Sequence, residues 1–300
     1  FRDGVNADRD ASDYKKEVIP IQRGDKLPVK LMNGGGWVAR IERVNSFSQS
    51  NGLVEKSEPW DRISQGEYLI ENVTWNVQAA KSPWTETIYC DTIKDTMGWR
   101  WDFSKETDKP ENYTVKSFPE IIYGHKPYKG YSSTTSRLPA ALNTSQFILD
   151  YEYTASADGI YNTSTDISFT DSKNPGESNI RAKLMIWFDQ QNMPFYSPEK
   201  LKQVVIDEIS YKIYIDTTHT GPEGKWNLIA LLPDHFQSTG KLNLQKYIDF
   251  LLDAGALERG WYLSSIEAGS EIASGKGEVV FKKFAVHANS IGGLSNAKTN

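Results

Sequence analysis

The sequence predicts an all-β sandwich with one short helix. Apolar runs that suit short strands recur along the chain, and turn residues separate them at the spacing of an all-β sandwich. Only residues 242–252 carry apolar side chains at three- and four-residue helical steps, and Gly255 follows as a stop signal. The sequence lacks the repeated helical crossovers of a doubly wound α/β fold. We therefore expect the single helix to pack as a strut on the outer sheet.

The expected strands divide the chain into three parts. Two strand-like runs come early, at 18–21 and 37–41, and a connector rich in Ser, Asn and Gly follows at 47–58. Later strands are expected at 67–70, 115–123, 147–153, 167–169, 182–188, 204–206, 212–215, 226–231, 262–266 and 279–286. We expect an N-terminal extension over 1–55 packed on or beside the sandwich, the sandwich domain over 56–292, and a tail over 293–300.

Composition and charge exclude some classes of function. The formal net charge of -5 argues against a nucleic-acid-binding protein, which normally has a basic excess. No apolar run reaches the roughly 18 residues of a membrane span, so we expect no membrane partner. Aromatic residues make up 12% of the chain, which is typical of clefts where flat rings stack on sugars. Sandwiches are also rich in Tyr and Trp for structural reasons.

The few cysteine and histidine residues predict neither a disulfide nor a metal site. Cys90 is the single cysteine and has apolar neighbours, which indicates a buried strand position. The four histidines are scattered and form no HxxxH pair, so we expect no metal and no cofactor. The chain begins at Phe1, and it contains four Asn-x-Ser/Thr sequons, at Asn72, Asn112, Asn143 and Asn162. These features favour a processed, secreted protein, which we expect to be a monomer.

Four segments resemble motifs of glycoside hydrolase family 12, in the order in which the family has them. The matches are 115–124 with VKSYP…YG, 161–169 with YDIWF, 183–188 with ELMIWL, and 265–275 with SVQAGTEPFTG. Upstream, 75–76 and 98–99 are similar to the family's early Trp motifs. The resemblance extends over about residues 60–290, and residues 1–55 have no counterpart in it.

This resemblance implies a concanavalin-like jelly roll of two curved antiparallel sheets, with a groove on the concave face for an extended β-1,4-glucan. It also implies a retaining mechanism, in which a nucleophilic glutamate and an acid/base glutamate lie about 5 Å apart. Glu271 matches the acid/base and Asp166 the aspartate that supports the nucleophile. Met185 and Trp187 match residues that line the cleft. Where the family has its nucleophile, this sequence has a lysine, Lys183.

Lys183 cannot perform the nucleophile's role, because an amine cannot attack an anomeric carbon and then leave as a glycosyl ester does. Strand alternation puts Arg181 and Lys183 on the same side. The apolar residues between and after them require a core on the other side, so Lys183 is expected on the open face. On the facing strand, alternation puts Glu267 and Glu271 together.

The first of three hypotheses is a polysaccharide lyase. Lys183 would be the base, with its pKa lowered by burial or by Arg181. Arg181 would stabilise the carboxylate of a uronate, and Glu271 or a cleft tyrosine would protonate the leaving oxygen. This hypothesis, which we place first, predicts a β-linked, acidic polysaccharide as the substrate.

The other two hypotheses keep hydrolysis or abandon catalysis. Hydrolysis could persist through Glu267 or Asp166, and an inverting pair of Asp166 and Glu271 would need a separation of about 6.5–9.5 Å. Alternatively, an ion pair of Lys183 with Glu271 or Asp166 would quench the site and leave a sugar-binding or decoy protein. We favour an enzyme over a binding protein.

Several aromatic residues are candidates for contacts with sugar. Four tryptophans could stack on a glycan or belong to the core: Trp75, Trp99, Trp101 and Trp187. Tyr123, His125 and Tyr128 lie at or in a loop that contains Gly and Pro and follows a strand, where substrate contacts often arise.

Overall fold

The chain divides into two compact units, Phe1–Gln49 and Ser50–Asn300. The computed structural model describes residues 2–3, 14–15, 52–128, 132–221 and 224–290. In the first unit, the described residues form one antiparallel pair, β1 (Arg2–Asp3) with β2 (Tyr14–Lys15). The strands expected at 18–21 and 37–41 and the tail expected from 293 lie outside the described residues. The packing of the extension stays a prediction.

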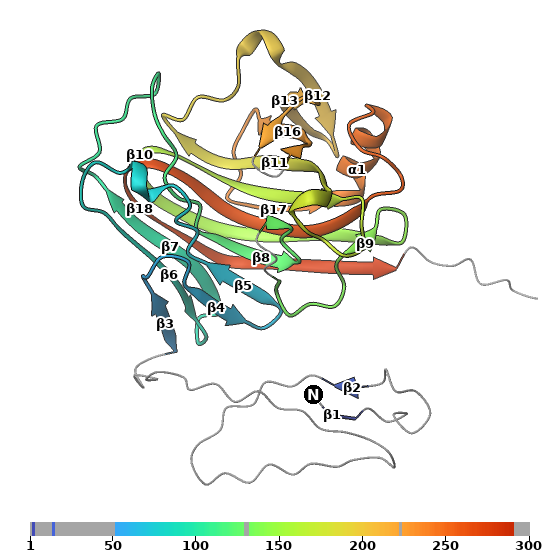
Figure 1. Cartoon of the computed structure of the whole chain (residues 1–300), viewed down its shortest axis with the longest axis horizontal. Helices are drawn as coiled ribbons and strands as arrows, with labels where there is room; N and C mark the ends of the chain where they lie inside the picture. Colours follow the sequence, from blue (N-terminus) through green and yellow to red (C-terminus); the bar gives the residue numbers. More distant parts are fainter. Residues whose placement is uncertain (1, 4–13, 16–51, 129–131, 222–223, 291–300) are drawn as a thin grey trace, which may run out of the picture. The chain divides into compact units, whose positions relative to one another are not determined.

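Two long strands of the second unit pass through both layers of a sandwich (Figure 1). β10 (Ser145–Thr170) and β18 (Tyr262–Ser290) pair with each other, antiparallel, from end to end. Odd-numbered β10 residues belong to the main core in both halves of the strand: Phe147, Leu149, Tyr151, Tyr153, Tyr161, Ile167 and Phe169. Each half of β10 therefore lies in a different layer, and the two layers share one core.

The first half of β10 lies in a sheet that we call the back layer. Its strand order is β17-β10-β18-β7-β6-β3, with neighbours antiparallel throughout. The added strands are β17 (Thr239–Asn243), β7 (Thr96–Phe103), β6 (Thr85–Asp91) and β3 (Leu53–Lys56). Strand β3 crosses the boundary expected between residues 55 and 56, and it pairs with β6 as part of the sandwich.

The second half of β10 lies in the larger sheet, which we call the site layer. Its order is β12-β13-β16-β11-β10-β18-β8-β5-β4, and only the pair β11 and β16 is parallel. The strands are β12 (Lys202–Ile206), β13 (Ile209–Asp216), β16 (Asn227–Pro233), β11 (Ile180–Gln191), β8 (Glu120–Gly124), β5 (Tyr68–Glu71) and β4 (Arg62–Gln65). β9 (Ala140–Ala141) pairs with the start of β18, and β14 (Thr220–Gly221) with β15 (Gly224–Lys225).

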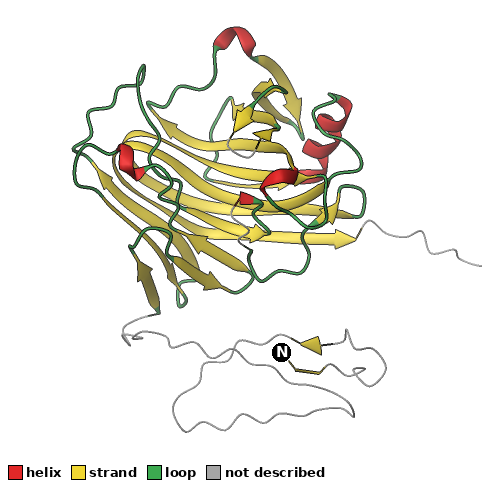
Figure 2. Ribbon diagram, viewed as in Figure 1, coloured by secondary structure: helices red, strands yellow, loops and turns green. Residues whose placement is uncertain are grey.

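The expected α-helix is confirmed close to its bounds, and it is the only α-helix among the described residues. α1 (Leu244–Asp253) begins after Asn243, whose side chain accepts a hydrogen bond from the backbone N–H of Gln245. Its buried face, at Leu244, Tyr247, Ile248 and Leu251, belongs to the main core of the sandwich. Short 3-10 turns occur at Val77–Ala79, Glu177–Asn179 and Pro198–Lys200. Figure 2 shows the predominance of strand, which confirms the all-β prediction.

The strand prediction differs from the structure at several places, and the strand expected at 115–123 begins only at Glu120. Residues 145–170 and 262–290 are continuous strands, although small and polar residues near 155–159 and 270–277 indicate loops. Gly159 and Gly275 are partners in the ladder, and both have positive φ, at 109° and 86°, which lets the two strands turn together between the layers. β7 was not expected as a strand. Of β6, only the buried strand position of Cys90 was expected, and it is confirmed, because Cys90 lies in β6 with 1% of its surface exposed.

Candidate functional site

The predicted catalytic residues lie on the face of the site layer that is turned away from the core, which we call the site face. Even-numbered β10 residues face this side, because their odd neighbours are in the core. Asp166 is opposite Met185 on β11 and Glu267 on β18, and Asn162 is opposite Glu271. On β11 the core takes the even residues, so Lys183 lies on the site face as expected.

Lys183 forms an ion pair with Asp166. The Lys183 Nζ lies 2.7 Å from Oδ2 of Asp166; the Lys183 side chain is 18% exposed and that of Asp166 is fully buried. Ser164 donates a hydrogen bond of 2.8 Å to the other oxygen of Asp166. Burial alone would lower the pKa of Lys183, but the charge of Asp166, helped by Tyr128 and Glu267, outweighs it and raises the pKa well above its usual value. Lys183 is therefore held protonated, which is unsuited to a general base.

Two aromatic rings flank the Lys183 ammonium group. Its Nζ lies 5.5 Å from the ring centre of Phe118 and 5.4 Å from that of Tyr128, within cation–π range. Phe118 lies against Gly269 of β18, and a Cβ at Gly269 would be only 2.6 Å from the Phe118 ring. The lack of a side chain at Gly269 thus makes room for Phe118 beside the ion pair.

Glu271 is half-buried and is held by Asn162. Nδ2 of Asn162 donates a hydrogen bond of 2.5 Å to Oε2 of Glu271, and Oδ1 of Asn162 accepts one of 3.3 Å from the Glu271 backbone N–H. Burial raises the pKa of Glu271, and the charge of Asp166 adds to this; Asn162 and Lys183 offset only part of the rise. A carboxyl with a raised pKa suits a proton donor. Sequence reasoning missed this role of Asn162, although Asn162 lies in a segment that resembles a family motif.

Arg181 is paired away from Lys183 and Glu271, and Glu267, although close to the Lys183–Asp166 pair, is buried and held by two serines. Arg181 forms an ion pair of 2.5 Å with Asp171 near the end of the β10–β11 hairpin. Glu267 is fully buried, and its Oε1 accepts hydrogen bonds from Ser265 at 2.5 Å and Ser168 at 3.4 Å. With Arg181 paired elsewhere and Glu267 covered, the expectation that they act in catalysis loses its geometric basis.

An aromatic cluster covers the β11 side of the site face. Met185 and Trp187 belong to it, and the indole N–H of Trp187 points to the Met185 sulfur at 2.9 Å. Tyr196 stacks on Tyr214 with ring centres 4.0 Å apart and planes 2° from parallel. Burial, followed by the charges of Glu271 and Asp166, raises the pKa of Tyr196, which places this ring close to both carboxyls.

Two further rings of the site face come from the loops. Phe195 packs edge-on against Trp187 at 5.0 Å, and Tyr113 packs against the same cluster. Sequence reasoning missed Tyr113, Phe118, Phe195 and Tyr196. A run of aromatic residues just after a strand, as at 195–196, was the available signal for the last two.

The structure corrects several of the expected sugar contacts. Trp99, Trp101 and Tyr123 all lie in the main core, with at most 4% of their surface exposed, so none has a free ring face for a sugar. Trp75 is 51% exposed. His125 is half-buried, its Nδ1 lies 2.5 Å from the Ser132 hydroxyl, and burial lowers its pKa.

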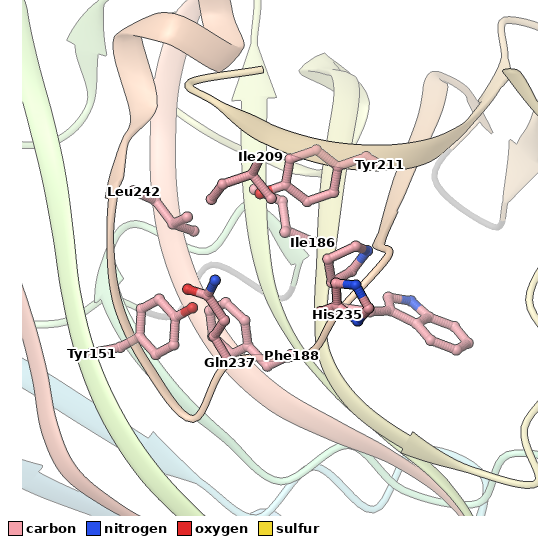
Figure 3. A pocket seen from close by; sticks show the side chains of 10 residues that line it. Tyr151, Ile186, Phe188, Ile209, Tyr211, His235, Gln237 and Leu242 are labelled. Atoms are coloured by element: carbon pink, nitrogen blue, oxygen red, sulfur yellow. The ribbon is translucent and has the colours of Figure 1, made fainter. Parts of the chain in front are cut away.

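Two cavities lie away from the site face. One of ≈20 Å³ is lined by Tyr151, Ile186, Phe188, Tyr211, His235 and Gln237 among others (Figure 3), and it is large enough for a single water. A wider cleft of ≈560 Å³ lies over the back layer between β6, β7, β18 and β10, lined by residues that include Arg100, Asp102, Lys276 and Glu278. Neither cavity contains a predicted catalytic residue.

The structure also bears on metal ligands, membrane-spanning helices and the glycosylation sequons. Among the described residues, no group of three or more His, Cys, Asp and Glu could hold a metal ion. No helix in the described part is long and apolar enough to span a membrane. Of the four sequons, Asn72 and Asn162 are fully buried and have bonded amides, so in the folded protein only Asn112 and Asn143 are exposed for glycosylation.

Comparison with known proteins agrees with this geometry. The family model of glycosyl hydrolase family 12 matches residues 66–290. Endoglucanase S of Pectobacterium parmentieri is 27% identical over 73% of this chain and 80% of its own length. The inactive glycoside hydrolase XLP1 of Phytophthora nicotianae is 23% identical over 72% and 84% of the two chains. The native family 12 xyloglucanase of Bacillus licheniformis superposes with a TM-score of 0.70, at 26% identity, over 79% of this chain and 100% of its own. This chain belongs to glycosyl hydrolase family 12.

Proposed function

We propose that the protein binds a neutral β-1,4-glucan on its site face and does not cleave it by the retaining mechanism. The observation that carries this proposal is the ion pair of Lys183 with Asp166, at the position where the family resemblance puts the nucleophile. A protonated lysine there offers no lone pair for attack, and the aspartate that would assist a nucleophile is engaged in neutralising it.

A neutral glycan fits the charges of the site face. The cations that suggested a uronate polymer are both compensated, Lys183 by Asp166 and Arg181 by Asp171. The raised pKa of Glu271 also favours a neutral, hydrogen-bonding carboxyl. Partly exposed rings such as Tyr196 and Phe118 are suited to stacking on the apolar faces of sugars. The endoglucanases and xyloglucanases among the relatives further support the binding of a β-1,4-glucan.

The two enzymatic hypotheses draw less support. A lyase needs a base, and Lys183 is held in its protonated form by Asp166. An inverting hydrolase needs Asp166 to activate a water, but Asp166 has no exposed surface and accepts contacts from Lys183 and Ser164. Of the expected catalytic carboxyls, only Glu271 is still suited to its role, as a general acid, and the second carboxylate that hydrolysis needs is missing.

The test compares the wild-type protein with Lys183→Glu, which restores the family's carboxylate beside Asp166. We expect wild-type protein to bind xyloglucan or another neutral β-1,4-glucan in calorimetry and to release no new reducing ends. Lys183→Glu should release them measurably, and adding Glu271→Gln should reduce this gained rate about 100-fold or more. Lys183→Gln is the matched control, because it removes the ammonium without supplying a nucleophile, and it should stay inactive.

Three outcomes would contradict the proposal. Reducing ends released by the wild-type protein from a neutral glucan would establish a hydrolase with another carboxylate pair. Reducing ends together with ultraviolet absorbance of unsaturated uronates, on an acidic polymer, would establish the lyase. Absence of binding to every glucan tested would also reject the proposed role.

A further inference from the structure

Another lysine with little exposed surface, Lys126, lies in the loop that carries Tyr128. Lys126 follows β8 by two residues, and only 10% of its side chain is exposed. Its ammonium forms ion pairs with Glu120 on β8 and, at 3.3 Å, with Glu71 on β5. Both carboxyls are fully buried. The loop residue is thereby tied to two neighbouring strands of the site layer from within.

The charges around Lys126 make this tie difficult to replace. Arg62 shares the Glu71 carboxyl at 2.8 Å, and the buried Glu267 adds a third negative group nearby. Burial alone would lower the pKa of Lys126, but the carboxyls of Glu120, Glu71 and Glu267 outweigh it and raise the pKa. Burial likewise raises the pKa of Glu120, with Lys126 opposing the rise. Removing this one ammonium would leave buried carboxyls without their main counter-charge.

The backbone at the base of the loop is fixed independently of Lys126. The N–H of His125 donates to Ser264 O at 2.8 Å, and the Gly124 N–H donates to Ser133 Oγ at 3.0 Å. His125 and Ser132 also pair as an isolated bridge. These contacts hold the backbone on both sides of the loop, and Lys126 adds a side-chain tie within the segment that leads to Tyr128.

We propose that Lys126 is a positioning residue for the glycan site. By anchoring its loop to Glu71 and Glu120, it holds the Tyr128 ring against the Lys183 ammonium, where Tyr128 and Phe118 together flank the centre of the site face. The effect on glycan affinity rests on the proposed function. The effect on the position of Tyr128 does not.

The test separates these two effects by using two readouts on the full chain. Ring currents of Tyr128 and Phe118 shift the Lys183 side-chain signals in lysine-selective NMR, and Lys183→Gln assigns those signals. In Lys126→Met we expect the Lys183 signals to move toward those of an ordinary lysine. We expect affinity for xyloglucan to fall about two- to tenfold, the size of one stacking or cation–π contact. Lys126→Arg should have the Lys183 signals and the xyloglucan affinity of the wild-type protein, because arginine keeps the positive charge.

A control variant and a substitute variant complete the test. Lys283→Met removes an ion pair with Asp150 in the back layer and should change neither readout. If Lys126→Met does not fold, the double variant Lys126→Met/Glu120→Gln removes the unpaired charge as well and is measured instead.

The possible failures are distinguishable. Unchanged Lys183 signals in a folded Lys126→Met protein would overturn the positioning role. Shifted signals with unchanged glycan affinity would overturn the link between Lys126 and binding. If wild-type protein bound no glucan, the proposed function would fail, and the NMR readout would still decide whether Lys126 positions Tyr128.

Discussion

Side chains alternate between core and outer face in both halves of strand β10, but the outer-face side chains are exposed in one half and buried in the other. In the back layer, Glu152, Thr154, Ser156 and Asp158 are exposed, as polar residues on an outer face normally are. In the site layer, Asn162, Ser164, Asp166 and Ser168 also point away from the core, yet none has any exposed surface. Lys183 pairs with Asp166 on this face, and the rings of Phe118 and Tyr128 lie over the Lys183 ammonium group.

This difference identifies the functional half of the sandwich. Polar groups that lose water cost free energy unless they find partners, so a fold gains nothing by burying them on an outer face. The site half keeps them in a network of ion pairs and hydrogen bonds, as with Asp166 between Lys183 and Ser164. In the back half, Asp150 pairs instead with Lys283 and Lys241, which are 47% and 71% exposed.

The largest contrast is expected when each half loses its aspartate. Asp166→Asn leaves the largely buried Lys183 ammonium without its counter-charge, and we expect a loss of about 3 kcal/mol or more in the free energy of unfolding. Asp150→Asn releases two lysines that water can solvate, and we expect about 1 kcal/mol or less. Urea denaturation of both variants under one condition measures the contrast.

A double variant tests the reason for that contrast. In Asp166→Asn/Lys183→Met both charges are gone, and most of the lost stability should return because no unpaired charge remains buried. Equal losses for Asp166→Asn and Asp150→Asn would mean that the two halves do not differ as argued.

The fold could be predicted wherever the pattern is local. The alternation on β11 places Lys183 on the outer face, and the helical spacing after Asn243 predicts α1. The continuity of β10 could not be predicted, because Gly159 breaks the apolar pattern, and only its pairing with Gly275 shows that the strand continues. Around Cys90 a strand position was predicted, but the extent of β6 and the whole of β7 were missed because polar side chains such as Thr87 and Arg100 interrupt their apolar runs.

The site could be predicted only to the level of its motifs. Sequence left open whether Lys183 pairs with Glu271 or Asp166, because the answer depends on the register between β10 and β11. The Lys126 anchor joins a loop to Glu120 on the preceding strand β8 and to Glu71 on β5, which is 55 residues away in sequence. The periodicity of apolar residues in the sequence does not predict such contacts between different elements. Trp99 shows the reverse limit, since a family motif can be a core contact, here with Ser270 at 3.0 Å.

The junction between the two halves of β10 should tolerate no side chain. A Cβ at Gly159 would lie 2.4 Å from the backbone oxygen of Ser274, and its φ of 109° is strained for any other residue. We expect Gly159→Ala to lower the free energy of unfolding by about 2 kcal/mol. Gly176→Ala is the matched control, because no atom lies within 4 Å of its Cβ and φ is -169°. Thermal unfolding of the pair checks this, and a neutral Gly159→Ala would show that the strands can separate at the bend.

The smallest effect is a difference in pH dependence between the two halves. The pKa of Glu271 is raised from 4.5 by burial and by Asp166, so the folded state holds its proton longer than the unfolded state. Stability should therefore fall as pH rises above about 4.5, by at most about 1.4 kcal/mol per pH unit for this one proton. Asp150 has a pKa lowered from 3.8, chiefly by the hydrogen bond from Lys283, so its contribution is present above pH 3.8 and is lost as pH falls.

Matched variants separate these opposite trends. Glu271→Gln should flatten the stability profile above pH 4.5 and leave the acid limb unchanged, whereas Asp150→Asn should flatten only the acid limb. Denaturant unfolding at a series of pH values measures both. An unchanged upper limb in Glu271→Gln would mean that Glu271 ionises in the folded protein as easily as in the unfolded chain. In that case the site half would hold no protonated carboxyl at Glu271, and the argument that this residue still acts as an acid would fall with it.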